Sequence, residues 1–292
     1  MIIIEAPRAM QQRAAQWRCA GETIGFVPTM GALHEGHLSL ARAARADCTK
    51  FVASIFVNPI QFGPHEDYGK YPRAFEHDCA LLEEAGCAVL FAPTVASMYE
   101  TQRPMANRDT DSRTFVEVMP LSEMWEGVVR PGHMRGVATV VAKLFNIVRP
   151  HRAYFGEKDY QQLKVLQHMV HDLNFDVEVV GMPTVREADG LALSSRNVYL
   201  NPEERQAALK LYQALQTAQS LARAGETDTA ALGAAMQQVC DADPLIAVHY
   251  ITIVEAETLA PLDKLDERPA RALIAARVGA TRLIDNLALA PF

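Results

Sequence analysis

The fold of this chain is decided in the stretch Gly25-Phe26-Val27-Pro28-Thr29-Met30-Gly31-Ala32-Leu33-His34-Glu35-Gly36-His37, which lies between a short apolar run and a helical pattern that begins at Leu38. Two histidines, His34 and His37, stand three residues apart where a strand gives way to a helix. At such a junction main-chain N–H groups and the helix dipole favour an anion, above all a phosphate. A neutral histidine there hydrogen-bonds to phosphate oxygens, and a protonated one stabilises charge that develops on them. The stretch therefore predicts a nucleotide-phosphate site.

Outward from this stretch, apolar runs typical of strands alternate with helical patterns. A strand, a helix and a second strand in succession favour a parallel sheet with right-handed crossovers. Strands are expected over residues 24–28, 50–57, 88–91, 115–118, 152–155 and 177–180, and helices over residues 38–46, 75–85, 137–148 and 160–173. This alternation predicts a doubly wound parallel α/β sheet of the Rossmann-like class. The polar segment 101–114 is expected to be a mobile excursion.

The pattern changes after about Arg186, where two Ala-rich and Gln-rich helical stretches are followed by closely spaced apolar runs. Helices are expected over residues 202–224 and 227–240, and strands over residues 248–254, 272–277 and 281–285. Helices followed by strands favour a smaller α+β domain. We therefore predict a nucleotide-binding domain over residues 1–183 and a smaller C-terminal domain over residues 184–292.

Length and composition are those of an ordinary soluble globular protein. The chain has 292 residues, of which 49% are apolar and 22% are charged, and this length suffices for one large or two unequal domains. The formal net charge of −7 argues against a dedicated nucleic-acid binder.

The cysteines and the N-terminus favour a cytoplasmic location. The five cysteines are odd in number, scattered and without a Cys-x-x-Cys spacing: Cys19, Cys48, Cys79, Cys87 and Cys240. Reduced thiols are therefore expected. The apolar run at residues 1–4 is too short for a signal peptide, and no apolar run approaches the roughly 18 residues that a membrane span needs.

The pair His34 and His37 has three possible roles. A helix places residues i and i+3 on one face, so both imidazoles can reach one ligand, and Gly31 and Gly36 let that ligand approach the main chain. For an isolated His-x-x-His, a helix cap with two exposed histidines is the more frequent outcome. A zinc site lacks a convincing third ligand nearby. The surrounding turn residues favour phosphate.

A second motif, Phe155-Gly156-Glu157-Lys158-Asp159-Tyr160-Gln161-Gln162, follows an expected strand and opens an expected helix. Ligands of open α/β sheets bind beyond the carboxyl ends of the strands. Lys158 offers charge to a phosphate, Asp159 suits ribose hydroxyls or Mg²⁺, and Gln162 offers a polar amide. By itself, the motif is better explained as an N-capping cluster.

A third motif, Ala192-Leu193-Ser194-Ser195-Arg196-Asn197, precedes the C-terminal helices. Two hydroxyls and a guanidinium form a compact set of donors for phosphate oxygens on a loop that can close during reaction. A solvated loop is the usual outcome for such a short pattern.

A fourth motif, Phe56-Val57-Asn58-Pro59-Ile60-Gln61-Phe62, ends the second expected strand. Its amides, from Asn58 and Gln61, can orient a small polar substrate. The alternative is a turn that contains a satisfied asparagine.

Taken together and in this order, these motifs and Arg130-Pro131-Gly132-His133 resemble the signatures of the pantoate–β-alanine ligase family, also called pantothenate synthetases. The resemblance extends to residues 189–197 and to the closing segment 281–286, and it covers almost the whole chain. The motif at residues 34–37 by itself is similar to that of the wider nucleotidyltransferase superfamily, which includes the class I aminoacyl-tRNA synthetases.

The resemblance implies an ATP-dependent ligase that works in two steps. Pantoate carboxylate attacks the α-phosphorus of ATP to give pantoyl adenylate and pyrophosphate, and the amine of β-alanine then displaces AMP. Mg²⁺ is expected to bridge the β- and γ-phosphates. The family also implies homodimers, small-molecule substrates and a smaller domain that closes over the site.

The resemblance also assigns residues to roles. Catalysis is expected from His34, His37, Lys158, Ser194, Ser195 and Arg196. ATP is expected at Met30, Gly31, Ala32, Leu33, His34, Glu35, Gly36, His37, Gly156, Glu157, Lys158, Asp159, Val185, Leu193, Ser194, Ser195 and Arg196. Pantoate or β-alanine is expected at Pro28, Met30, Asn58, Gln61, Arg130, Val140, Val141 and Gln162. By resemblance to the family, His37 is the residue usually described as the proton donor. The first step needs no proton, so we interpret both histidines as stabilisers of phosphate charge.

Two positions depart from the family pattern. His77 precedes Asp78 where many members carry paired acids, so a metal role for Asp78 is only weakly expected. The segment 107–113 is more charged than the loop expected there, and no function is assigned to it.

Two rivals remain at this point. One is another adenylate-forming enzyme of the superfamily, and the other is a non-catalytic nucleotide-binding protein. Gln61 and Gln162 favour pantoate over other acids, and the intact phosphate-binding set favours an enzyme.

Overall fold

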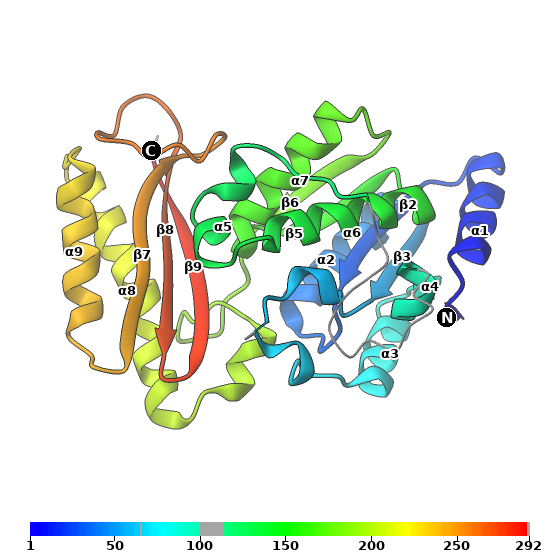
Figure 1. Ribbon diagram of the computed structural model, residues 1–292, viewed down its shortest axis with the longest axis horizontal. Helices are drawn as coiled ribbons and strands as arrows, with labels where there is room; N and C mark the ends of the chain where they lie inside the picture. The colour runs from blue at the N-terminus through cyan, green and yellow to red at the C-terminus, as the bar shows by residue number, and fades with distance from the viewer. Residues whose placement is uncertain (65, 100–113, 291–292) are drawn as a thin grey trace. The chain divides into compact units, whose positions relative to one another are not determined.

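The computed structural model describes residues 1–64, 66–99 and 114–290 (Figure 1). Contacts divide the chain into two compact units. The N-terminal unit comprises Met1–Glu157 and Gln162–Pro183, and the C-terminal unit comprises Thr184–Phe292 and the short segment Lys158–Gln161. This division differs from the predicted domains in the segment 158–161, which the sequence assigned to the first domain.

The N-terminal unit is built on a six-stranded parallel sheet of order β1-β4-β3-β2-β5-β6. The strands are β1 (Ile2–Ile4), β2 (Ile24–Thr29), β3 (Lys50–Ile55), β4 (Val89–Phe91), β5 (Arg152–Gly156) and β6 (Glu178–Met182). From β2 the chain proceeds to one side through β3 and β4, and later to the other side through β5 and β6. Ligands of open α/β sheets bind beyond the carboxyl ends of the strands at such a reversal. The predicted doubly wound sheet is confirmed.

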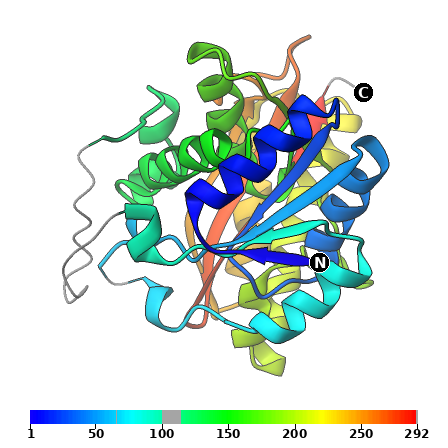
Figure 2. The same ribbon diagram turned by 90° about the vertical axis from the view of Figure 1, so that its right-hand side faces the viewer.

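Helices cover both faces of this sheet, with α1 and α6 on one face and α2 and α3 on the other (Figure 2). The helices are α1 (Pro7–Cys19), α2 (Glu35–Asp47), α3 (Phe75–Glu84), α4 (Val95–Tyr99), α5 (Glu126–Val129), α6 (His133–Val148) and α7 (Tyr160–Asp172). Short 3₁₀ turns are η1 (Pro59–Gln61), η2 (Asp67–Gly69), η3 (Leu121–Glu123) and η4 (Glu157–Asp159).

The central strands β2 and β3 are mostly apolar because they are buried on both faces. Val27 and Phe51 pack in one core cluster with residues of α2 and α3, whereas their neighbours Phe26 and Val52 point to the opposite face and are also buried. Continuous apolar runs, rather than alternating ones, are typical of such parallel strands. The core therefore fixes where β2 and β3 deliver the loops that follow them.

A glycine sets the position of α6 against the turn η1. A Cβ atom on Gly136 would lie 2.6 Å from the Cα atom of Gln61 and 2.6 Å from the carbonyl oxygen of Ile60. No larger residue fits without moving the main chain. Gly136 therefore lets α6 pack directly on the turn that carries Gln61.

Several features of the N-terminal unit differ from the sequence predictions, among them the short helices α4 and α5, which were not predicted. The strand β1 and the helix α1 were not predicted, since α1 buries only Met10 and Ala14. The strand expected over residues 115–118 is wrong. There, the N–H of Val116 donates to Thr139 Oγ1 (3.0 Å) and that of Val118 to Ser122 Oγ (3.1 Å). Side chains thus satisfy main-chain groups that a neighbouring strand would otherwise bind. Residues 101–113 of the predicted excursion lie outside the described residues.

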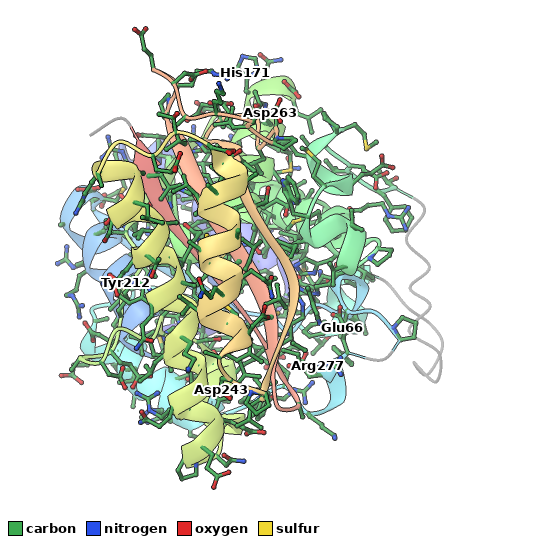
Figure 3. All side chains as sticks on the ribbon, turned by 90° about the vertical axis from the view of Figure 1, so that its left-hand side faces the viewer. Glu66, His171, Tyr212, Asp243, Asp263 and Arg277 are labelled. Atoms are coloured by element: carbon green, nitrogen blue, oxygen red, sulfur yellow. The ribbon has the colours of Figure 1, made fainter. Side chains whose placement is uncertain are left out.

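The C-terminal unit consists of an antiparallel sheet and two covering helices, as Figure 3 shows. The sheet order is β7-β8-β9, with β7 (Ile246–Glu255), β8 (Ala270–Val278) and β9 (Thr281–Ala290). The helices are α8 (Pro202–Arg223) and α9 (Thr229–Asp241), preceded by the 3₁₀ turn η5 (Ser195–Tyr199). Leu215, Leu232 and Ile274 belong to one buried cluster between these layers. The predicted smaller α+β arrangement is confirmed.

The N-terminus of α8 shows why the helix begins there. Asn201 accepts from the N–H of Glu204 (2.9 Å), and the carboxylate of Glu204 accepts from the N–H of Asn201 (3.0 Å). Pro202 follows at the first helical position, where its missing N–H costs nothing.

All five cysteines are free thiols. Over the described ranges, we find no helix with both the length and the apolar character needed to cross a membrane.

Candidate active site

The loop between β2 and α2 is held by a carboxylate from α3. Asp78, which is 1% exposed, accepts from the N–H groups of Ala32 and Leu33, each at 2.8 Å. Gly31 and Ala32 both have positive φ angles, of 86° and 51°, and a Cβ on Gly31 would lie 3.0 Å from the Asp78 carboxylate. Asp78 thus compensates for a left-handed turn that aims the loop toward α2.

His34 and His37 lie side by side at the start of α2. Their ring centroids are 4.2 Å apart, and the N–H of His34 donates to Nδ1 of His37 (3.3 Å). Because that nitrogen accepts, the neutral His37 ring carries its proton on Nε2. Both imidazoles are half-buried. The predicted shared face is therefore present, and the two rings are also part of the helix cap.

The main-chain groups of this loop are used within the protein. The N–H of Gly31 donates to Thr29 Oγ1 (3.1 Å), those of Ala32 and Leu33 donate to Asp78, and that of His34 donates to His37. The main-chain N–H groups of residues 31–34 thus have partners within the protein, and the predicted binding of ATP along this loop stays a prediction. The candidate anion-binding groups here are the imidazoles and the first turn of α2.

The amide of Gln61 is oriented by buried neighbours. Asn58 donates through Nδ2 to Gln61 Oε1 (2.9 Å) and to the carbonyl of Gly136 (3.2 Å), and it accepts from the hydroxyl of Tyr99 (2.7 Å). Gln61 in turn donates to the sulfur of Met30 (3.3 Å). Asn58 is 1% exposed and its amide holds the amide of Gln61, while its predicted contact with substrate stays a prediction.

Arg130, for which a contact with substrate is predicted, binds an acid that the sequence predictions did not include, and the substrate contact itself stays a prediction. Arg130 binds Glu66 through two hydrogen bonds, from Nε (2.7 Å) and from Nη2 (2.6 Å), and a third nitrogen lies 2.9 Å from Nε2 of His133. The carboxylate of Glu66 thus occupies the two-pronged face of the guanidinium that a substrate carboxylate would need.

His133 links this ion pair to the substrate turn, because its Nδ1 lies 2.8 Å from the carbonyl oxygen of Gln61. Removal from water, together with the nearby charge of Arg130, lowers the pKa of His133 to about 4. The ring is therefore neutral at pH 7 and donates from Nδ1, which leaves the lone pair on Nε2 directed at Arg130.

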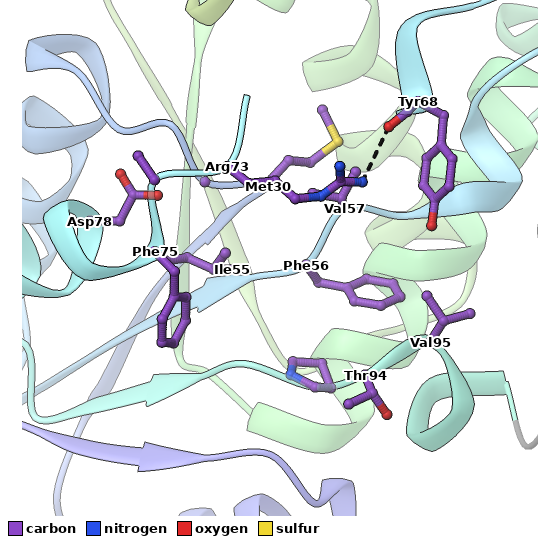
Figure 4. A pocket seen from close by; sticks show the side chains of 13 residues that line it. Met30, Ile55, Phe56, Val57, Tyr68, Arg73, Phe75, Asp78, Thr94 and Val95 are labelled. Carbon is purple, nitrogen blue, oxygen red and sulfur yellow. Dashed lines mark hydrogen bonds between the residues drawn. The ribbon is translucent and has the colours of Figure 1, made fainter. Parts of the chain in front are cut away.

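The remaining residues predicted for pantoate have apolar surroundings. Val140 and Val141 are buried in α6, while Pro28 and Met30 are half-buried at the end of β2. Beside Met30 lies a cavity of about 260 Å³ that is also bounded by Phe56, Tyr68, Arg73 and Phe75 (Figure 4). Among the described residues predicted to hold pantoate, only Met30 lines this cavity. The cavity therefore lies next to the turn that carries Gln61, because Gln61 donates to the sulfur of Met30.

The second motif divides between the units. Gly156 and Glu157 belong to the N-terminal unit, Lys158 and Asp159 to the C-terminal unit, and Gln162 to the N-terminal unit again. Lys158 Nζ lies 3.7 Å from a carboxylate oxygen of Asp159, and their side chains are 19% and 49% exposed. A Cβ on Gly156 would meet no atom within 4 Å. The predicted cation and acid are thus neighbours.

The third motif forms a short hairpin and a turn. The N–H of Leu193 donates to the carbonyl of Val185 (3.0 Å), which brings together two residues predicted for the nucleoside. Ser194 caps η5 and accepts from the N–H of Arg196 (3.2 Å). Ser194, Ser195 and Arg196 are half-buried, so the predicted donor set stays compact.

The last feature of the site is its capacity to bind a metal ion. Throughout the described segments, no group of three or more His, Cys, Asp or Glu side chains could hold a metal ion. Both oxygens of Asp78 bind main-chain N–H groups, so its weakly expected metal role stays a prediction without support from this geometry. Mg²⁺ that travels on substrate phosphates needs only one or two protein carboxylates, and a half-exposed acid such as Asp159 fits that need.

The fold and the histidine-bearing loop at the carboxyl edge of the sheet define a Rossmann-like α/β protein of the kind that binds nucleotides. A model of the family described as pantoate–β-alanine ligase matches residues 2–288. The chain therefore belongs to the pantoate–β-alanine ligase family.

Relatives named pantothenate synthetase support this membership. That of Rubrobacter xylanophilus is 56% identical over 287 residues, which cover 98% of each chain, and that of Thermotoga neapolitana is 53% identical, with 99% and 100% covered. The crystal structure of pantothenate synthetase from Thermus thermophilus matches with a TM-score of 0.89, 51% identity and full coverage of both chains. A Francisella tularensis pantoate–β-alanine ligase, complexed with βγ-ATP and β-alanine, matches with a TM-score of 0.79 and 32% identity, with 99% and 97% covered.

Proposed function

We propose that this protein condenses pantoate with β-alanine at the expense of ATP, through a pantoyl adenylate, and releases AMP and pyrophosphate. The observation that carries the proposal is full-length similarity to enzymes of this name, above 50% identity, in a chain that retains every predicted motif. The location we propose is the cytoplasm, and the proposed assembly is a homodimer.

In the first step, a carboxylate oxygen of pantoate forms a bond to the α-phosphorus of ATP. At the same time the bond breaks between this phosphorus and the oxygen that bridges to the β-phosphate, and pyrophosphate leaves with that oxygen. Negative charge grows on the phosphate oxygens during this displacement. We assign its stabilisation to donors and cations, namely His34, His37, Lys158, Ser194, Ser195 and Arg196. Mg²⁺ carried in with ATP would offset the negative charge of the leaving pyrophosphate, and Asp159 would be the carboxylate available to hold it.

Pantoate binding is assigned to the N-terminal unit. Gln61 offers an amide that Asn58 and Met30 hold in place, and the valines of α6 with Pro28 offer apolar surface to the geminal methyl groups. Gln162 offers a second amide. Because the turn of Gln61 is fixed by Gly136 and His133, it is preorganised before substrate arrives.

In the second step, the amine of β-alanine attacks the acyl carbon of the adenylate. The bond from that carbon to the AMP oxygen breaks, and the amine loses a proton to solvent or to a nearby base. We assign the acceptance of β-alanine to the same unit, in which Glu66 binds the guanidinium of Arg130.

The proposal is tested by incubating the protein with ATP, Mg²⁺, pantoate and β-alanine and following AMP. AMP should accumulate only when both acids are present, and pantoate by itself should support exchange of labelled pyrophosphate into ATP. ADP as product, or exchange that is indifferent to pantoate, would contradict the proposal. Exchange with a different carboxylic acid would identify another adenylate-forming ligase of the superfamily.

A further inference from the structure

The closing segment 281–286 resembles the family's pattern, yet the proposed function gives it no role. In the structure, it is the first half of β9. Asp285 and Asn286 are 6% and 4% exposed. Two adjacent polar side chains buried in a strand of a small sheet need specific partners, because an unpaired buried polar group is costly.

Asn286 binds the segment that contains Lys158. Its Nδ2 donates to the carbonyl oxygen of Lys158 (2.9 Å), and its Oδ1 accepts from Nη1 of Arg271 (2.5 Å). The guanidinium of Arg271 lies 3.8 Å from the ring centroid of Tyr160, whose hydroxyl donates to the carbonyl of Ala256 (3.0 Å). The segment 158–160 is therefore held at the main chain and at an aromatic ring.

Asp285 binds the hairpin that leads to Ser194. Its carboxylate accepts from Arg186 at 2.6 and 2.9 Å, and their side chains are 5% and 15% exposed. Arg186 also donates to the carbonyl of Gly190 (3.1 Å) and stacks 3.8 Å from the ring centroid of Tyr212. The turn between Arg186 and Ala192 is thus fixed to β9.

Adjacent residues of one strand therefore hold two segments that are distant in sequence. Lys158 and Ser194, together with Asp285, also line one small cavity of the C-terminal unit. We propose that Asp285 and Asn286 are positioning residues that fix the cationic segment of Lys158 and the loop 194–196 relative to each other. The inference rests on the proposed function, in which both segments bind phosphate groups. A misplacement of about 1 Å at such a site can cost on the order of 10² in rate.

The test compares Asn286→Asp with Gln219→Leu. Asn286→Asp keeps an acceptor for Arg271 but removes the donor to Lys158. Gln219→Leu removes a comparable hydrogen bond elsewhere on β9, in which the half-buried Gln219 of α8 donates to the carbonyl of Ala288 (2.8 Å). Asn286→Leu and Asp285→Asn complete the series. Pantoate-dependent exchange of pyrophosphate into ATP is measured for each, along with amide hydrogen exchange of residues 158–161.

In Asn286→Asp we expect kcat for exchange to fall at least ~10-fold, while KM for pantoate stays within about twofold because pantoate is assigned to the N-terminal unit. Amide exchange of residues 158–161 should rise, and Gln219→Leu should match wild type in both measurements. Wild-type kcat per folded molecule in Asn286→Asp would overturn the inference, and so would unchanged protection of residues 158–161. A wild-type protein that lacks pantoate-dependent exchange would instead contradict the proposed function, and the hydrogen-exchange comparison would still test the contact.

Discussion

At the scale of single residues, Asp78 binds main-chain N–H groups of the loop for which the sequence predicts ATP. A carboxylate and a phosphate are both anions that accept from main-chain N–H groups, so the same loop chemistry serves either one. Here the acid comes from α3, and it binds the turn that precedes His34. The loop is therefore shaped by the protein itself before any nucleotide binds.

We predict that Asp78→Ala destabilises the fold by about 2–3 kcal/mol, because one buried and one half-buried N–H group lose a charged acceptor. Urea unfolding should show this loss as a lower midpoint. Glu76→Ala, which changes an exposed acid in the same first turn of α3, should stay within roughly 0.5 kcal/mol of wild type. Undiminished stability in Asp78→Ala, combined with a changed requirement for Mg²⁺, would instead support the metal role.

Lys158 gives a second prediction at this scale. Lys158→Ala should lower the rate of adenylate formation by ~10² or more, because a cation that stabilises charge in the transition state is lost. Exchange of pyrophosphate into ATP measures this step. The exposed Lys264 of the same unit is the matched control, and Lys264→Ala should retain the wild-type rate. Near-normal exchange in Lys158→Ala would mark the lysine as structural.

At the scale of elements, α6 connects the substrate turn to the Glu66 segment. Its first residue, His133, contacts the carbonyl of Gln61, and its Gly136 packs against the same turn. Arg130, just before the helix, pairs with Glu66, and this environment holds the pKa of Glu66 below its usual range. The turn η1 is thus fixed from two sides by one helix.

The lowered pKa of His133 predicts a pH dependence of stability. Because its folded pKa of about 4 lies below the ordinary value of 6.5, the unfolded chain binds more protons between these values. The stabilisation is complete above about pH 6.5 and is lost as the pH falls toward 4, with a slope of at most about 1.4 kcal/mol per pH unit. Urea unfolding at several pH values measures this slope.

His133→Asn should flatten this part of the profile, because its amide can donate to Gln61 but does not titrate. His171→Asn is the control, since the side chain of His171 is 86% exposed. A profile of His133→Asn that parallels wild type between pH 4 and 6.5 would contradict the assignment.

At the scale of the whole molecule, each compact unit has its own buried cluster. In the N-terminal unit the cluster joins the parallel sheet to α2 and α3, and in the C-terminal unit it joins α8 and α9 to the antiparallel sheet. Separate cores are the condition for separate cooperative units.

Leu215→Ala tests this separation, because Leu215 is fully buried in the C-terminal cluster. The cavity should cost about 3 kcal/mol. Hydrogen exchange should rise mainly over residues 184–290, whereas amides of β2 and β3 should keep their protection. Leu221→Ala, which changes an exposed leucine of α8, should alter little. An equal loss of protection in both sheets would show that the units unfold together.

Much of the fold follows from local sequence. Apolar runs and helical periodicity specified most strands and helices, because burial on both faces of a parallel sheet requires such runs. Short or weakly apolar elements were not predicted, since β1 has three residues and α1 buries only two side chains. Residues 115–118 are the converse case, because they were expected to form a strand and do not. An apolar run forms a strand only where a neighbouring strand can pair with it.

The sequence by itself determined the doubly wound class and the motifs from which we propose the residues of the chemistry, because strand-to-helix junctions, glycine turns and ordered motifs are local features. Only the tertiary structure decided how those residues are held. Asp78 binds a loop 46 positions earlier, Glu66 meets Arg130 across 64 positions, and Asn286 reaches Lys158 across 128. Such pairings depend on which chain segments the packed sheets bring together, and no local periodicity encodes that proximity.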